Sequence, residues 1–491
     1  MGLWGVYAGA QAMDVYQKLV DVAGNNVANA ATPGYSAQRA NLVSAPPVTI
    51  AGDAYPGPGM VSSGAEVVSV TRLRSFALDV QYRQATATGG FWDAQAQGLQ
   101  HVEALLGGPA TAPFQQALDG YFTAWNAVAQ DAQNLGVRAA ALGKAQTLVI
   151  AANDLSMQVQ QLVGDLQGQA QADVTQANQL LSQIAGLENA IARQQAMGQQ
   201  PNDLMDRRDL LLDQLAQLMP IGVQITPSSG AGTGEGFTVT AKDATGNEIS
   251  LLGRTAGSGT VTVQQTLQLD PTGGTLQAVP GDGGDPVVLA SGGEIAGLLA
   301  AAQKAGSFLQ GLDALMQQVA SQANALLASG YDLYGAQGST QTFLFVLADA
   351  TGQPIQVSGA YQPPEAGAPL AVNPTLIDDP ARLAVAQAPP DAGRPSTDGQ
   401  IAGRIAGGQP AADGQWAQVV NALATDSQSA QQQATISDSV VQTLQQQRQQ
   451  FSGVDLNQEV AALIASQSAY QAAARVVSVN YQMLQDLLQH V

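Results

Sequence analysis

The final part of the chain carries its most regular pattern of hydrophobic positions. From Leu456 onward, positions separated alternately by four and three residues are non-polar or aromatic, with Gln467 as the polar exception. This heptad spacing predicts a helix with one apolar stripe of the coiled-coil type. We expect the stripe to be covered by a distant part of the chain or by another molecule. Its positions are Leu456, Val460, Leu463, Gln467, Tyr470, Ala474, Val477, Tyr481, Leu484, Leu488 and Val491.

The two ends of the chain share this need for a partner. Asp455 is a predicted N-cap for the C-terminal helix, with Glu459 in its first turn. A weaker helical stripe spans residues 3–31 and ends in the segment NNVANAATPGYS, residues 25–36, where Pro and Gly predict a turn. We expect both terminal helices to be poorly ordered alone and to gain order when a neighbour buries their apolar sides. The N-terminal stripe consists of Val6, Ala10, Met13, Val20 and Val27.

Periodicity divides the middle of the chain into long helices and one β-rich stretch. An alternating segment at residues 64–73 predicts a strand, and residues 221–290 are rich in Val, Thr and Gly. Ser291 with Glu294 forms a capping-box pattern at the return to helix. A hairpin is expected around Asp349 to Gly352. Helical spacing covers residues 75–106, 113–130, 135–199, 203–220, 291–327 and 413–450.

The predicted fold is an α+β multidomain chain with a terminal coiled coil, a long helical-bundle body and inserted β-rich material. The predicted domains are residues 1–50 with 452–491 for the coiled coil, 51–220 with 291–451 for the body, and 221–290 for the β domain, with 336–412 as a possible small β or loop insertion within the body.

Composition excludes several classes of function. The chain has 491 residues, a formal net charge of −20 and a pI near 4.2, which disfavours nucleic acid and anionic membranes as partners. Cysteine is absent, so disulfides and thiolate zinc sites are excluded. The N-terminus has no basic segment before its apolar residues, so no cleaved signal peptide is expected.

The few features that suggest catalysis have simpler interpretations. His101 and His490 are the only histidines, which excludes a multi-histidine metal site. The glycines of residues 230–236 lack the Lys and the following helix of a phosphate loop and are interpreted as a flexible β connection. Residues 281–285 resemble a calcium-binding nonapeptide, but the pattern occurs once, whereas such sites need stacked repeats. No catalytic residue, cofactor or metal is therefore predicted, and we expect the protein not to be an enzyme.

The densest acidic cluster lies on the predicted helix at residues 203–220. Its carboxylates could serve as the acid pair of a glycosidase. They alternate with Arg207 and Arg208 on an amphipathic helix, so we interpret them as a solvated face. The cluster consists of Asp203, Asp206, Asp209 and Asp213.

The two termini together resemble those of the flagellar axial proteins, the family of rod, hook and hook-associated subunits. NNVANAATPGYS is similar to the N-terminal signature of the family, and SGVDLNQEVAALIASQSAYQAAARVVSVNYQMLQDLL, from Ser452, is similar to its closing helix. PNDLMDRRDLLLDQLAQL, from Pro201, and AVNPTLIDDPARLA, from Ala371, resemble segments of the hook-associated members. The resemblance covers roughly the first 100 and last 50 residues strongly, the helical body moderately, and not the β-rich stretch.

The resemblance implies a structural adaptor between hook and filament, located on the bacterial flagellum outside the cell. It implies export in unfolded form and polymerisation at the hook tip. The implied partners are further copies of the chain, the hook protein, a second hook-associated junction protein and an export chaperone that holds the C-terminal segment. Assembly would then depend on Asn25, Asn26, Asn29, Thr32, Pro33, Gly34 and Tyr35 in the N-terminal turn, and on Leu456, Val460, Leu463, Tyr470, Val477, Tyr481, Leu484 and Leu488 in the stripe.

Other interpretations remain open at this point. A hook or rod subunit is the nearest alternative, and the internal segments from Pro201 and Ala371 argue against it. A secreted polysaccharide hydrolase is a more distant alternative. The β-rich stretch could also bind a host surface.

Overall fold

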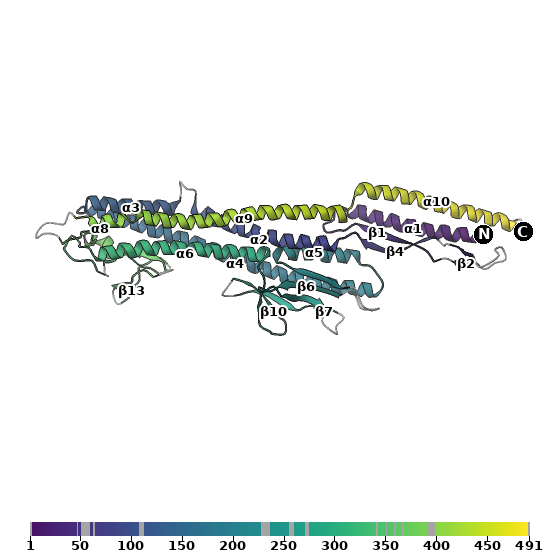
Figure 1. The fold of residues 1–491 in the computed structure, drawn as a ribbon, viewed down its shortest axis with the longest axis horizontal. Coiled ribbons are helices and arrows are strands. Elements are labelled where there is room, and N and C mark those ends of the chain that lie inside the picture. Colours follow the sequence, from purple (N-terminus) through teal and green to yellow (C-terminus); the bar gives the residue numbers. More distant parts are fainter. Residues whose placement is uncertain are drawn as a thin grey trace.

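The molecule is a long rod with both ends of the chain at the same end (Figure 1). A β-rich insertion projects from one side near the middle of the rod. The computed structural model describes residues 2–46, 48–50, 59–61, 64–107, 112–226, 236–254, 260–270, 274–339, 342–349, 351–357, 360–365, 368–389 and 398–489.

Long helices that run along the rod form its body. They begin where the sequence supplies caps: Ser75 Oγ accepts a hydrogen bond from the Leu78 N–H, and Asn134 Oδ1 accepts from the N–H groups of Gly136 and Val137. α2 packs along α6 and α9, and α4 packs along α6 (Figure 1). The body helices are α2 (Phe76–Leu106), α3 (Pro113–Gln130), α4 (Leu135–Ala196), α5 (Asn202–Leu218), α6 (Gly293–Ala328), α8 (Gln400–Ala406) and α9 (Gln409–Ser452).

Two hydrophobic cores hold the body together. The core at the end of the rod opposite the chain ends is built around buried aromatic residues such as Tyr121, Trp125 and Phe345. The second core joins α4, α5 and α6 to the β insertion, through residues such as Leu212 and Phe237. One window of α4 is apolar enough to cross a membrane by length and composition alone. Its core side chains, however, pack against other helices of the body.

The β insertion lies between α5 and α6 and consists of two small antiparallel sheets. The stretch VTVQQTLQL, from Val261, is split at Gln264, whose N–H donates to Leu251 O in one sheet and whose C=O accepts from the Gly281 N–H in the other. The turn at Asp243–Asn247 joins two neighbouring strands. The first sheet has the order β5 (Gly222–Thr226), β6 (Gly236–Lys242), β7 (Glu248–Arg254), β8 (Val261–Val263), and the second β11 (Val287–Val288), β10 (Leu276–Pro280), β9 (Gln265–Leu269).

The start of α6 differs from the predicted capping box. Gly292 occupies the N-cap position and no side chain caps the helix. Gly293 has φ of 73°, and a Cβ at this position would lie 2.3 Å from Leu218 O. The end of α5 therefore presses directly on this backbone, and its close approach leaves Ser291 outside the cap.

Short strands and helical turns complete the body and the region beside the termini. The loop at Asp349 is closed by hydrogen bonds from the N–H groups of Thr351 and Gln353 to the Asp349 carboxylate, as the predicted hairpin requires. The remaining body elements are β12 (Phe345–Leu347), β13 (Gln356–Val357), β14 (Ala360–Tyr361), β15 (Leu370–Val372), α7 (Pro374–Asp378) and η2 (Pro380–Arg382). Beside the terminal helices lie β1 (Gln38–Ser44), β2 (Val48–Ile50), β3 (Gly59–Val61) and β4 (Ala65–Arg72).

The terminal helices α1 (Gly2–Asn29) and α10 (Leu456–Gln489) pack antiparallel along each other (Figure 1). Near their free ends the helices pack closely at Gly9, where a Cβ would lie 2.6 Å from Val477 Cγ2 and 3.6 Å from Ala473 O. The expectation that these helices are poorly ordered before assembly stays a prediction, while the structure shows the two helices packed on each other. Each helix supplies the apolar neighbour that the other lacks.

Candidate assembly surface and joint

One side of α10 forms a seam against α1. Its members are buried or half-buried and follow steps of four and three residues. The predicted stripe residues Leu463, Tyr470, Val477 and Leu484 belong to this seam. They alternate with Glu459, Ser466, Ala473 and Asn480, which were not predicted.

Of the other predicted stripe residues of α10, Leu456, Val460, Gln467 and Tyr481 are exposed, whereas Ala474 is half-buried. Val460 is 46% exposed, Tyr481 is 59% exposed, and Leu456 is similarly open. The reason is geometric: a single helix of the width of α1 covers only part of a broad apolar stripe. The side chain of Leu488, together with His490 and Val491, lies outside the described residues.

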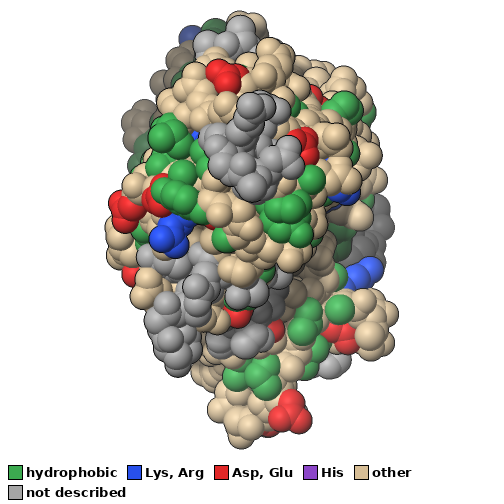
Figure 2. Space-filling model, turned by 90° about the vertical axis from the view of Figure 1, so that its left-hand side faces the viewer, with side chains coloured by type: hydrophobic (Ala, Val, Ile, Leu, Met, Phe, Trp, Pro, Cys, Tyr) green, Lys and Arg blue, Asp and Glu red, His purple; other side chains and the backbone are tan. Residues whose placement is uncertain are grey.

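Further exposed apolar side chains are distributed around the part of α10 that α1 does not cover. We call the following residues the outer stripe: Leu456, Val460, Ile464, Val476, Val479, Tyr481 and Met483. At the opposite end of the rod, by contrast, apolar side chains appear in separate groups among polar atoms (Figure 2). Several exposed large apolar side chains on one helix are typical of a surface that another molecule covers.

Asn26 links the N-terminal turn to α10. Its Oδ1 accepts hydrogen bonds of 2.9 Å from the Gln38 N–H and the Tyr35 hydroxyl. Its Nδ2 donates to Gln38 O at 2.9 Å and to Glu459 Oε1 at 3.0 Å. The side chain is 1% exposed, so these four bonds satisfy a buried amide. One residue thereby ties α1, the turn, β1 and α10 together.

The other predicted residues of the turn shape it locally. Asn29 Nδ2 donates to Asn25 Oδ1 at 2.7 Å, and Thr32 Oγ1 donates to Asn29 Oδ1 at 3.2 Å. Gly34 has φ of 80°, and a Cβ there would lie 3.2 Å from Leu210 Cβ. The side chains of Asn25, Thr32 and Pro33 are exposed. This outer part of the turn is therefore open to contact.

Tyr35 lies half-buried between Asn26 and an acidic region. Burial raises its pKa to about 12, and the nearby carboxylates of Asp206, Asp203 and Glu459 act in the same direction. The hydroxyl therefore keeps its proton at all physiological pH values and donates it to Asn26.

The acidic cluster of α5 is largely buried, so its interpretation as a solvated face is wrong for its central members. Asp206 and Asp209 are almost fully buried, Asp213 is half-buried, and only Asp203 is exposed. Arg208 on α5 itself compensates Asp209, but the other arginines lie far away in sequence, on β4, in the segment after it, on α2 and on α9, which periodicity within α5 could not indicate. The cluster comprises the cations Arg72, Arg74, Arg83, Arg208 and Arg448 and the anions Asp79, Glu188, Asp206, Asp209 and Asp213.

Asp209 is the centre of this ionic cluster. Its carboxylate lies 2.9 Å from an Arg72 nitrogen and 2.9 Å from an Arg208 nitrogen, with Arg74 at 3.4 Å. Burial by itself would raise the pKa of Asp209, but the surrounding guanidinium groups outweigh it and hold the pKa well below its usual range. The carboxylate stays ionised, as a buried charge can when it is fully paired.

The same cluster fixes the terminal helices to the body. The Ser36 N–H donates to Asp206 Oδ2 at 3.1 Å, and the Ala37 N–H donates to Ser452 O at 2.8 Å, at the last residue of α9. Asp213 bridges Arg83 and Arg448 at 2.7 and 2.8 Å. These contacts join α1, α5, α2 and α9 at one place, which we call the joint.

Comparison with known proteins agrees with this architecture. The family model for the helical domain of flagellar hook-associated protein FlgK matches residues 99–343. The model for the C-terminal region of flagellar basal body rod proteins of the FlgEFG type matches residues 445–490, which include α10. The chain belongs to the FlgK family of flagellar hook-associated proteins.

Relatives support the FlgK assignment along the whole chain. Flagellar hook-associated protein 1 of Bacillus subtilis is 26% identical over 99% of this chain and 97% of its own length. Its Salmonella typhimurium counterpart is 25% identical over 66% of this chain and 57% of its own length. The structure of the hook junction protein FlgK from Burkholderia pseudomallei shares the fold, with a TM-score of 0.54 and 18% identity over 76% of this chain and all of that one. The resemblance of the termini and the α+β multidomain fold are thereby confirmed.

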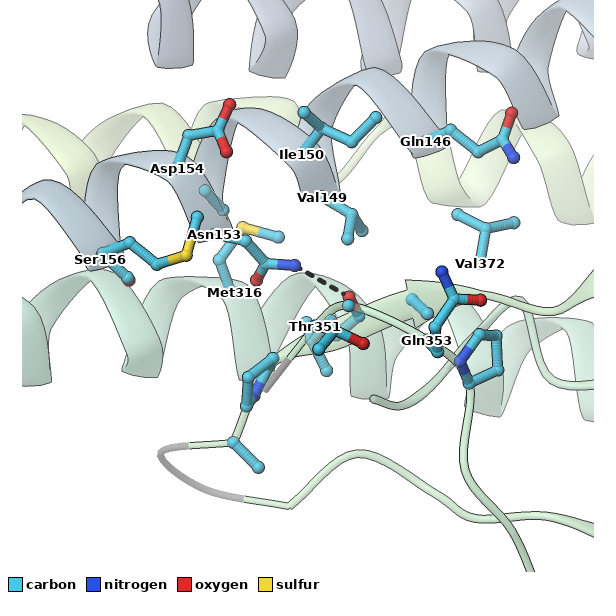
Figure 3. A pocket seen from close by; sticks show the side chains of 18 of the residues that line it. Gln146, Val149, Ile150, Asn153, Asp154, Ser156, Met316, Thr351, Gln353 and Val372 are labelled. Carbon is cyan, nitrogen blue, oxygen red and sulfur yellow. Dashed lines mark hydrogen bonds between the residues drawn. The ribbon is translucent and has the colours of Figure 1, made fainter. Parts of the chain in front are cut away.

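The FlgK family is a family of flagellar structural proteins. Among the described residues, no group of three or more His, Asp or Glu side chains is arranged to hold a metal ion. A groove of about 840 Å³ lies between α4, α6 and the loops at residues 351–354 and 368–372. In it Asn153 Nδ2 donates to Leu370 O at 3.0 Å, while Asp154 points away from the loops (Figure 3). The labelled lining consists mainly of amides and aliphatic side chains, which do not form a nucleophile with its base.

Proposed function

We propose that the protein is a structural adaptor at the junction of the bacterial flagellar hook and filament. The observation that carries the proposal is the outer stripe of α10, an apolar surface held at a fixed place on a rod by a buried ionic joint. Burying a Val, Leu or Ile side chain contributes roughly 1.5–3 kcal/mol when complete, so about half of that remains available at each half-exposed position. Several such positions together can hold a subunit in a polymer.

The proposed route follows from this surface. The chain is exported in unfolded form without a cleaved signal peptide and polymerises at the hook tip outside the cell. Its partners are further copies of the chain, the hook protein and a second hook-associated junction protein. An export chaperone covers the C-terminal segment until delivery, which would protect the outer stripe from aggregation.

We also propose a separate role for each region of the chain. Residues 1–50 with 452–491 form the assembly domain, 51–220 with 291–451 form the body, and 221–290 form an outward β domain. In the assembly domain, Asn26 and Tyr35 position the helices, while Asn25, Thr32 and Pro33 and the outward residues of α10 contact neighbours. The half-buried Leu463, Tyr470, Val477 and Leu484 hold α10 on α1.

Electron microscopy of cells that lack this protein tests the proposal. The expected picture is hooks without filaments, with flagellin released into the medium. Cells that instead lack hooks would support the alternative of a hook or rod subunit. Cells with normal filaments would contradict both.

A further inference from the structure

A second group of carboxylates, in the middle of the body, has no counter-charge. Asp93 on α2, Asp173 on α4 and Glu294 on α6 are half-buried, and among the described residues none of them forms an ion pair. Asp173 Oδ2 is buried without a hydrogen-bond partner. The joint differs in this respect, because its buried carboxylates form ion pairs with arginines.

Two of the three carboxylates line one small cavity of about 180 Å³, and the third, Asp173, is close enough for the charge of Glu294 to act on it. Asp93, Glu294 and His101 line it directly, and Gln169, one turn before Asp173, lines it from α4. Asp438 on α9 adds a further negative charge that acts on Asp93. The other polar lining groups are the amides Gln97 and Gln217. His101 is thus the one titratable base that faces the cavity among its described lining residues.

The helices cannot separate to relieve the repulsion without losing close packing. A Cβ on Gly90 would lie 2.8 Å from Gln217 O, one on Gly98 would lie 2.5 Å from Ala301 Cβ, and one on Gly297 would lie 2.3 Å from Phe91 O. Glycine at these positions allows α2, α5 and α6 to touch backbone to backbone. The carboxylates are therefore held near one another by the packing of the body.

We propose that Asp93, Asp173 and Glu294 form a proton-sensitive element that makes the helical body less stable at neutral pH than in mild acid. At neutral pH the like charges repel one another and lack full hydration. A proton on one carboxylate lowers both costs. The helical body is then easier to unfold at neutral pH than in mild acid. The proposal is independent of the assembly role.

The direction of the effect follows from proton binding. Burial, with the charge of Glu294, raises the pKa of Asp173 to about 6, and burial also raises the pKa of Glu294 and of Asp93. The folded chain therefore binds protons in a pH range where the unfolded chain has already released them. Stability contributed by these groups rises as the pH falls from about 6 toward about 4, because the folded state is then the better proton acceptor.

Thermal unfolding of the full-length protein at pH 7.5 and 4.5 tests this proposal. Asp173→Asn removes the charge at nearly constant shape, so it should raise the Tm at pH 7.5 by about 2 °C. The gain should fall by more than half at pH 4.5. Glu294→Gln should act in the same direction, and the double variant should gain less than the sum, since each carboxylate is part of the other's repulsion.

The control is Asp154→Asn, which removes an exposed carboxylate from the same helix and should leave the pH dependence unchanged. Glu294→Gln carries the test if Asp173→Asn does not fold. Equal Tm changes at both pH values, or a lower Tm at pH 7.5 for the variants that fold, would overturn the proposal.

Discussion

Asn26 Nδ2 donates a hydrogen bond of 3.0 Å to Glu459 Oε1, a residue 433 positions later in the chain. This bond closes the two ends of the protein on each other at the base of the terminal helices. The same place is fastened to the body by the bond between the Ser36 N–H and Asp206. The terminal helices are thus held at the joint, whereas the outer stripe remains uncovered.

Removing the Asn26 amide should loosen this closure. In Asn26→Ala the Gln38 N–H and the Tyr35 hydroxyl lose their acceptor and Glu459 loses a donor, so we expect a cost of about 1–3 kcal/mol. Hydrogen exchange should show faster exchange along α1 and α10 and little change in the body. Asn25→Ala, which removes an exposed side chain bonded only within the turn, is the matched control. Equal exchange rates in the two variants would contradict this role.

Neutralising Asp209 should destabilise the whole joint. The buried guanidinium groups of Arg72, Arg74 and Arg208 would lose their shared partner, and breaking a buried charge pair costs about 3–5 kcal/mol. Urea unfolding should therefore show a markedly lower midpoint for Asp209→Asn. Asp203→Asn alters an exposed carboxylate on the same helix and should change the midpoint little. Similar midpoints for the two variants would show that the cluster is not structural.

Acid should lower the stability that the joint contributes, whereas it should raise the stability contributed by the cavity carboxylates. The pKa of Asp209 is lowered in the folded state, so its stabilising contribution is fully present above the usual aspartate value near 4. It is lost as the pH falls further toward the lowered pKa. The difference in Tm between the native protein and Asp209→Asn should stay constant from pH 7 to about 5 and shrink below about pH 4. A difference that shrinks between pH 7 and 5 would contradict this assignment.

Replacing two glycines in the N-terminal region by alanine should change the free energy of unfolding in opposite directions. Gly34 has φ of 80° and lies against Leu210, so Gly34→Ala should cost about 1–2 kcal/mol. Gly24 lies within α1 with open space around it, so Gly24→Ala should stabilise the helix by up to about 1 kcal/mol. Chemical denaturation measures both changes. A stabilising Gly34→Ala would show that the turn adopts another conformation.

The regular patterns of the sequence could predict most elements of the fold. Apolar spacing gave α4 and α10 their approximate extent, and the turn at residues 32–35 follows from its Pro and Gly. These features are local, because each depends on residues within a few turns of one another. The prediction of a capping box at Ser291 was wrong because the start of α6 depends on a non-local contact. The backbone at the end of α5 lies directly against Gly293.

The joint could not be predicted, because its residues meet only in three dimensions. Asp206 and Asp209 look like solvent-facing charges when α5 is considered alone. Their partners Arg72 and Arg74 come from a segment more than a hundred residues away. The division of α10 into a seam and an outer stripe could not be predicted from the sequence either, because it depends on where α1 lies. The predicted stripe mixed the two surfaces, because it contained both the half-buried Leu463 and the exposed Val460.

The central claim is that the outer stripe, and not only the α1 seam, carries assembly. Ile464→Gln with Val479→Gln changes exposed positions of α10, so the thermal transition of the purified protein should be preserved within about 1–2 °C. Gln471→Ser, at an exposed polar position of the same helix, is the control for substitution as such. In cells that lack the native protein, the fraction of hooks that carry filaments, counted by electron microscopy, is the decisive measurement. We expect the control to restore filaments and the outer-stripe variant to leave hooks bare, whereas filaments at the native frequency with that variant would contradict the claim.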